Sequence, residues 1–211
     1  MPRPSLREQI LDAGLRVMFR AGFVGASVRD VMGEAAAPQG SFTNHFRSKE
    51  AFAGEVLDRY FAHVRGLVRQ ALDDPNLTPR ERLRRYLDLI TERLAADNFT
   101  RGCLIGDFSL EAAPISEPLR AQLAAIYAEW RVPFARCIAE AQLTGEIAAR
   151  MPADELADFL LASWQGAIMR MKVDRTPAAL ERFKAIAFQT VFAASSAASP
   201  SSPTGLKPAE P

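Results

Sequence analysis

The chain has 211 residues, 48% of them apolar, which is enough for a hydrophobic core without disulfide or metal support. Its formal net charge of +1 excludes the strongly basic footprint of a protein that coats nucleic acid without regard to sequence. Cys103 and Cys137 form neither a zinc pattern nor a disulfide framework. No signal peptide and no apolar run near about 18 residues is visible, so we expect a cytoplasmic protein with no membrane partner.

A first helix is expected to begin after Ser5 and to end at Gly22. Ser5 can cap its first turn, and one face carries an apolar stripe of Ile10, Leu11, Leu15, Met18 and Phe19. The residues before it form a short arm, Pro2 to Pro4, that contains Arg3. This arm either reaches a minor groove or a phosphate, or it is a frayed terminus.

Two short helices joined by a tight turn are expected next. Ser27 can cap the first of them, whose inward face is Val28, Val31, Met32 and Ala35. The second runs from Gln39 to Phe46, with Phe42 and Phe46 pointing back toward the first. Its outward residues are polar and mostly uncharged, as a helix that reads base edges in a major groove requires: Gln39, Ser41, Thr43, Asn44 and His45.

At these positions the sequence resembles the TetR/AcrR family of bacterial transcriptional repressors. The motifs that carry the resemblance are Gly22-Phe23, Ser27-Val28-Arg29-Asp30-Val31, Gly40-Ser41-Phe42, His45-Phe46 and Ser48-Lys49-Glu50. Ala36 stands where the family usually has the turn glycine, Pro38 where it has a capping Ser or Thr, and Thr43 replaces the usual aromatic residue. A non-glycine residue at positive φ costs on the order of 1 kcal/mol, so the turn should survive Ala36.

The resemblance implies a DNA-binding role for a defined set of side chains. It also implies a helix-turn-helix domain at 1–50 that carries a small positive surplus, seven Lys and Arg against five acids. The implied operator contacts are Arg3, Ser27, Arg29, Pro38, Gln39, Gly40, Ser41, Thr43, Asn44, His45 and Lys49.

The remainder of the chain reads as an all-α body at 51–194, with no competing strand pattern. Helices are expected at 49–72, from Pro79 onward with Leu83, Tyr86, Leu87, Ile90 and Leu94 inward, and at 103–113, 116–145, 153–174 and 177–194. A break at 98–102 separates the second and third of these helices, and Pro133 should kink or split the fourth. Residues 195–211 have the composition of a disordered tail.

The last two helices carry more apolar surface than one protomer needs. On the first the apolar residues are Leu156, Phe159, Leu160, Trp164, Ala167, Ile168 and Met171, and on the second Leu180, Phe183, Ile186, Ala187, Phe188, Val191 and Phe192. The family resemblance implies a four-helix interface between two copies of the chain. The alternative is packing within one chain. We favour the dimer, because two recognition helices about 34 Å apart give specificity that one rarely does.

Two segments of the body, 101–108 and 164–172, resemble the NemR/AcuR-like branch of the family, whose members respond to electrophiles or acrylate. Cys103 follows a glycine at a helix start, where the helix dipole and Arg101 would favour the thiolate that electrophiles and oxidants attack. Lys172, if close, would favour the thiolate further, and its amine could trap an oxidised sulfur. The alternative for Cys103 is a buried core residue, which is how Cys137 reads.

Aromatic residues of the body could line an effector cavity, although aromatics at helical spacing are more often core: Trp164, Phe108, Phe99, Tyr127 and Trp130. Lys172 is otherwise a solvated helix end. His63 reads as a surface residue with no partner.

The leading hypothesis is a homodimeric repressor on a pseudo-palindromic DNA operator, released when the body senses a small electrophile, oxidant or unsaturated acid, with Cys103 as the candidate sensor. Its partners are double-stranded DNA, a small-molecule effector and a second copy. A constitutive or architectural DNA-binding protein without sensing is the alternative, and near-neutral charge disfavours it. A thiol enzyme is remote, because the two histidines, His45 and His63, supply no Cys-His pair with an orienting acid. We expect no catalytic residues, no cofactor and no metal ligands.

Overall fold

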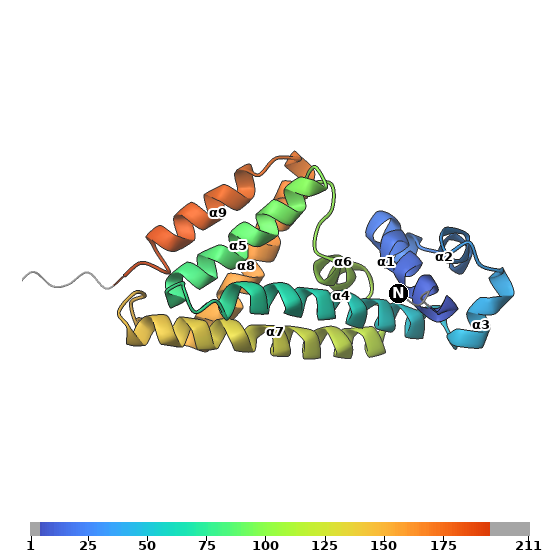
Figure 1. Cartoon of the computed structure of the whole chain (residues 1–211), viewed down its shortest axis with the longest axis horizontal. Coiled ribbons are helices and arrows are strands. Elements are labelled where there is room, and N and C mark those ends of the chain that lie inside the picture. The colour runs from blue at the N-terminus through green and yellow to red at the C-terminus, as the bar shows by residue number, and fades with distance from the viewer. Residues whose placement is uncertain (1–4, 195–211) are drawn as a thin grey trace, which may run out of the picture.

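The computed structural model describes residues 5–194 (Figure 1). The arm with Arg3 and the tail predicted at 195–211 lie outside the described residues. Within 5–194 the structure is helical and contains no strand, so the all-α fold is confirmed. The elements are α1 (Leu6–Gly25), α2 (Val28–Glu34), the 3₁₀ turn η1 (Gln39–Ser41), α3 (Phe42–His45), α4 (Lys49–Leu72), α5 (Pro79–Ala96), α6 (Leu104–Glu111), α7 (Glu117–Leu143), α8 (Ala153–Asp174) and α9 (Ala178–Gln189).

Helices α1 to α3 form a headpiece at one end of an elongated molecule, and the other helices form the body (Figure 1). Helix α4 belongs to both, since it leaves the headpiece and runs beside α7 into the body. Phe42, Phe46 and Phe52 are each at most 4% exposed, and their ring centroids lie 4.7 to 5.3 Å apart. The predicted inward direction of Phe42 and Phe46 is therefore confirmed, and their packing on Phe52 ties α3 to the start of α4.

The predicted helix starts coincide with side-chain caps. Ser27 accepts a hydrogen bond from the Asp30 amide at 3.1 Å, and the Asp30 carboxylate accepts one from the Ser27 amide. Ser5, Ser48, Thr78 and Ser116 accept similar bonds from the third residue of the helices that follow. Each cap stabilises its helix by about 1 kcal/mol. The position of a serine or threonine therefore predicted where each of these helices begins.

Of the two effects expected of Pro133, a kink or a split of the long helix, the split does not occur. Helix α7 runs unbroken from Glu117 to Leu143 with Pro133 inside it. Trp130, Phe134 and Cys137 lie on both sides of the proline and are all buried in the core. Packing of this face holds the two halves as one helix, although an internal proline costs about 3 kcal/mol in an isolated helix.

The last helix ends earlier than expected, at Gln189 rather than near Ala194. The chain turns at Thr190, and the Phe192 amide donates to the Ala187 carbonyl at 2.8 Å. Phe192 is thereby fully buried, and the Ala148 amide pairs with the Ala193 carbonyl at 3.0 Å. Burial of the Phe192 ring stabilises the chain more than another turn of helix would. This burial depends on other helices, so the periodicity of the sequence does not reveal it.

No helix within residues 5–194 combines the length and the apolar character needed to cross a membrane.

Candidate DNA-binding surface and effector pocket

The turn before the predicted recognition helix relies on Ala36, which adopts a positive φ of 50° as expected from its position. The Ala37 amide donates to the Met32 carbonyl at 3.0 Å and closes the turn. The helix predicted from Gln39 to Phe46 is not a single α-helix: it begins as the 3₁₀ turn η1 and continues as α3.

The polar residues of η1 and α3 form a recognition surface, defined here as Pro38, Gln39, Gly40, Ser41, Thr43, Asn44 and His45. All are exposed except Ser41 and His45, which are half-buried. The Thr43 hydroxyl donates a hydrogen bond to the Gly40 carbonyl at 3.2 Å. Gln39 and Asn44 make no side-chain hydrogen bond within residues 5–194, so their amides remain available to a ligand outside the chain.

The predicted DNA-contacting residues outside this surface divide into two kinds. Arg29 is exposed and has no hydrogen bond or ion pair among the described residues, as is also true of Arg47, which the sequence reasoning missed. Ser27 is committed to its capping box. Lys49 donates to the Val24 carbonyl at 3.3 Å and lies 4.9 Å from the centre of the Phe23 ring. Burial lowers the pKa of Lys49, partly offset by the nearby carboxylate of Glu111.

Glu111, at the end of α6, connects the body to the headpiece. Its carboxylate accepts a hydrogen bond from the Val24 amide at 3.0 Å. It lies over Gly22, whose φ of 72° breaks α1, and a Cβ at that position would collide with both carboxylate oxygens. Phe108, one turn earlier on α6, packs on Phe23 with ring centroids 5.7 Å apart. We call this cluster of Gly22, Phe23, Val24, Phe108 and Glu111 the α6 latch.

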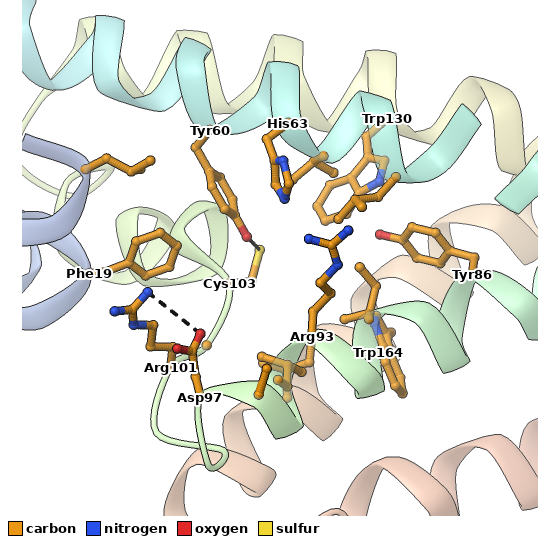
Figure 2. A pocket seen from close by; sticks show the side chains of 18 residues that line it. Phe19, Tyr60, His63, Tyr86, Arg93, Asp97, Arg101, Cys103, Trp130 and Trp164 are labelled. Carbon is orange, nitrogen blue, oxygen red and sulfur yellow. Dashed lines mark hydrogen bonds and ion pairs between the residues drawn. The ribbon is translucent and has the colours of Figure 1, made fainter. Parts of the chain in front are cut away.

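The body contains a cavity of about 460 Å³ between α1, α4, α5, α7, α8 and the segment 101–103 that leads into α6 (Figure 2). Of the predicted effector residues it brings together Cys103, Trp130 and Trp164. Phe108 is instead fully buried in the α6 latch, and Tyr127 lies behind Trp130, stacked at 6.2 Å with its hydroxyl 3.3 Å from that of Ser109. Phe99 does not line the cavity either.

Cys103 caps α6 and is 7% exposed, at the wall of the cavity. Two donors converge on its sulfur, the Gln165 side-chain amide at 3.2 Å and the Tyr60 hydroxyl at 3.7 Å. Hydrogen bonds to a charged acceptor are roughly twice as strong as neutral ones, so both donors would stabilise a negative charge on the sulfur. Burial raises the pKa of Tyr60 well above its usual value, so its hydroxyl keeps the proton that it donates.

The possible contact between the Lys172 ammonium and the Cys103 sulfur is not made in the described structure. The Lys172 ammonium pairs with Asp107, 3.2 Å from each carboxylate oxygen, while the lysine's alkyl stem lies against Gly102. Arg101, the other cation expected near the sulfur, pairs with Asp97 at 3.7 Å and lies over the Phe19 ring. Each cation is thus already balanced by a carboxylate.

Several lining residues were missed from the sequence: Tyr60, His63, Tyr86, Arg93 and Asp97. His63 is exposed, as expected, but it also lines the cavity (Figure 2). Arg93 follows Tyr86 and Ile90 on one face of α5. Arg93 interrupts an otherwise apolar stripe of this helix, and that pattern in the sequence could have identified it as a cavity residue.

Cys137 should resist alkylation while Cys103 reacts. Burial raises the pKa of the Cys137 thiol to about 12, and the thiol donates to the Pro79 carbonyl at 3.1 Å. The reactive thiolate is therefore a trace species near neutral pH. Iodoacetamide at about pH 8, followed by peptide mass spectrometry, should place the adduct on Cys103. The denatured chain, in which both thiols react, is the control, and preferential labelling of Cys137 in the folded protein would contradict this assignment.

No group of three or more His, Cys, Asp and Glu side chains within 5–194 is arranged to hold a metal ion.

Comparison with known proteins gives matches to both parts of the chain. Residues 10–56 match the family model described as bacterial regulatory proteins, tetR family, and residues 79–187 match the tetracyclin repressor-like C-terminal domain. The chain is 41% identical over 192 residues to the HTH-type transcriptional repressor DhaR of Mycobacterium sp. (strain GP1), covering 91% of this chain and 95% of that protein. It is 33% identical over 183 residues to the transcriptional regulator AcuR of Cereibacter sphaeroides, covering 86% and 84%.

The same fold is found in the crystal structure of reduced NemR from Escherichia coli. That structure superposes with a TM-score of 0.80 at 24% identity, covering 91% of this chain and 100% of NemR. The 33% identity to AcuR over 183 residues confirms the resemblance to the NemR/AcuR-like branch, which was expected from two short segments of the body.

Proposed function

The chain belongs to the TetR family of bacterial transcriptional regulators, and on that premise we propose a homodimeric repressor that binds a pseudo-palindromic operator. It leaves the operator when its body senses a small electrophile, an oxidant or an unsaturated acid. The observation that carries this proposal is that an exposed recognition surface in the headpiece and an apolar cavity in the body occur in one chain, with α6 running from the cavity wall to the headpiece.

Operator recognition is assigned to the recognition surface together with Arg29 and the predicted arm residue Arg3. Gln39 and Asn44 carry amides of the kind that pair with adenine in the major groove. Arg29 and Arg47 are exposed cations that suit phosphate contacts, which set the position on DNA without reading its sequence. Lys49 acts inside the headpiece, where it holds the Val24 carbonyl.

A dimer is supported by the apolar residues that packing within the chain leaves exposed on α8 and α9. Most of the predicted interface residues are buried in their own protomer, but Phe159 is 46% exposed, Met169 52%, Val173 77% and Ile186 56%. On α8, the small exposed residues Ala162 and Gly166 lie three positions from Phe159 and Met169 respectively and four from each other, so together they form one stripe along the helix. Helices pack closely along such a stripe, so two copies joined here would bury it. Sedimentation equilibrium should therefore give twice the protomer mass.

Coupling between cavity and headpiece is assigned to α6. The residue that caps its start, Cys103, lines the cavity, and its last residue, Glu111, binds the headpiece amide of Val24. Any shift of α6 when the cavity fills moves both ends of this short helix. A coupling free energy of about 1 to 3 kcal/mol changes operator affinity roughly 5- to 150-fold.

Covalent sensing, where the effector is an electrophile, is assigned to Cys103. Its thiolate would add to the β-carbon of an α,β-unsaturated carbonyl compound, forming a C–S bond, while the α-carbon takes a proton from water. The thioether product occupies the cavity and displaces the hydrogen bonds from Gln165 and Tyr60. The thiolate supplies the electron pair of the new C–S bond, and the π electrons of the carbon–carbon double bond form the new C–H bond at the α-carbon. The addition therefore needs no external oxidant.

Gel shifts on the promoter region of the protein's own gene test this proposal. The unmodified protein should bind, N-ethylmaleimide should release it, and Cys103→Ser should bind but no longer respond to the alkylator. Cys137→Ser is the matched control and should behave as the parent does. If Cys103→Ser is released as readily as the parent, covalent sensing through this residue is wrong; if no variant binds, the repressor assignment fails.

A further inference from the structure

The cavity of the body offers more hydrogen-bond donors than acceptors. Among its described lining residues Asp97 is the sole carboxylate, and it already pairs with Arg101. Arg93 has no ion pair and no hydrogen bond within residues 5–194. Figure 2 shows its guanidinium reaching from α5 toward the space between His63, Trp130 and Tyr86. Arg93 is exposed, so an unpaired positive charge lines the solvent-accessible part of a mainly apolar cavity.

Two buried indole nitrogens of the same cavity lack a hydrogen-bond partner. Trp130 is 4% exposed and Trp164 1% exposed, and neither ring N–H meets the geometry of a hydrogen bond to any described residue. Buried donors are nearly always satisfied in native proteins, by protein, water or ligand. Two unsatisfied donors that line one cavity indicate that an acceptor from outside the chain completes them.

Tyr86 adds a hydroxyl that stays protonated. Burial raises the pKa of Tyr86, and the nearby Trp130 N–H opposes that rise only weakly. The cavity therefore keeps its phenol neutral, as a donor. His63, an exposed lining residue, can donate from one ring nitrogen when neutral and from both when charged. All of these polar groups favour a ligand that is rich in acceptor atoms and carries negative charge.

We infer that this cavity binds a small organic monocarboxylate with an apolar chain. The carboxylate pairs with the Arg93 guanidinium and accepts hydrogen bonds from the buried indoles. This inference rests on the proposed function, because it names the class of effector that the body senses, and it makes that effector a reversibly bound anion.

The walls and the volume limit the rest of the ligand. The remaining lining is mainly aliphatic and aromatic, including Leu15, Phe19, Val64, Leu67, Ile90 and Ile168. A cavity of about 460 Å³ holds a small molecule rather than a long acyl chain. Arginine suits a carboxylate because its planar fork donates two parallel hydrogen bonds.

Tryptophan fluorescence reports this binding directly, since Trp130 and Trp164 are the two tryptophans of the chain and both line the cavity. The full-length protein is titrated with butyrate, hexanoate and benzoate and with the matching neutral amides. These acids have no reactive double bond for Cys103. At least one acid should bind, about ten- to hundredfold more tightly than its amide, and raise the melting temperature.

Arg93→Gln should weaken acid binding about ten- to hundredfold and leave amide binding unchanged. Arg85→Gln is the matched control, since Arg85 lies on the same helix but pairs with Glu92 away from the cavity. Equal affinity for acid and amide, equal effects of the two substitutions, or failure of all three acids to bind would overturn the inference.

Gel shifts run in parallel separate this inference from the proposed function. If the protein binds its promoter but none of the acids, the repressor assignment stands and the inferred carboxylate site is refuted. If the protein binds an acid through Arg93 but does not bind the promoter, the carboxylate site stands and the repressor assignment is refuted.

Discussion

The double variant Gln39→Ala with Asn44→Ala is expected to lose specific operator binding while keeping its fold. Both side chains are exposed and make no hydrogen bond within the described chain, so their removal should change the free energy of unfolding very little. A side chain that pairs well with a base edge contributes about 1 to 3 kcal/mol. Losing both should weaken binding by about 2 to 6 kcal/mol per half-site, which is roughly thirtyfold or more.

Fluorescence anisotropy with promoter DNA and with unrelated DNA measures this effect. Binding to unrelated DNA should be nearly unchanged, because phosphate contacts carry it. Gln70→Ala, an exposed glutamine of α4 outside the headpiece, is the matched control. Parent-like affinity of the double variant for promoter DNA would place the reading surface elsewhere.

Gly22→Ala is expected to destabilise the junction between headpiece and body. Gly22 has φ 72° and ψ −179°, a region that is essentially restricted to glycine and costs other residues about 1 to 3 kcal/mol. The added Cβ also collides with the Glu111 carboxylate and so breaks its hydrogen bond to the Val24 amide. A hydrogen bond to a charged group contributes about 1.5 to 3 kcal/mol. The free energy of unfolding should fall by about 3 to 5 kcal/mol.

Differential scanning calorimetry should show this loss as a lower melting temperature, by about 2 to 4 °C for each kcal/mol in a chain of this size. Gly25→Ala is the control in the same segment, because its added Cβ meets nothing closer than Ala21 at 3.6 Å. Glu111→Gln isolates the α6 latch from backbone strain and should weaken the response to effector more than it lowers stability. Equal melting temperatures for Gly22→Ala and Gly25→Ala would contradict the account of the α6 latch.

The headpiece could be predicted from the sequence because its determinants are local. Ser27 and Asp30 lie three positions apart and cap each other, and Phe42 and Phe46 lie one helical turn apart. The continuous helix through Pro133 and the early end of α9 could not be predicted in this way. Both depend on side chains buried against other helices, Phe134 in one case and Phe192 in the other.

The sensing site was only partly predictable. The position of Cys103 at a helix start was correct, but its partners Tyr60 and Gln165 come from distant helices. The sequence left open whether Lys172 lies beside the sulfur or is a solvated helix end, and in the structure its ammonium pairs with Asp107. Sequence spacing identifies which residues share a helix face, whereas pairing between helices depends on the packing of the whole body.

The division into a DNA-binding domain at 1–50, an effector and dimerisation domain at 51–194 and a tail at 195–211 stays a prediction. The structure shows why the first boundary is hard to draw: α4 begins at Lys49 in the headpiece and continues as part of the body.

The most direct measurement is footprinting of the protein on the promoter of its own gene, with the mass of the complex determined by sedimentation. The account predicts two protected half-sites on one face of the duplex, one helical turn or a multiple of it apart, occupied by paired protomers through Gln39 and Asn44. A lone protomer on the DNA, or protection without a preferred sequence, would contradict it.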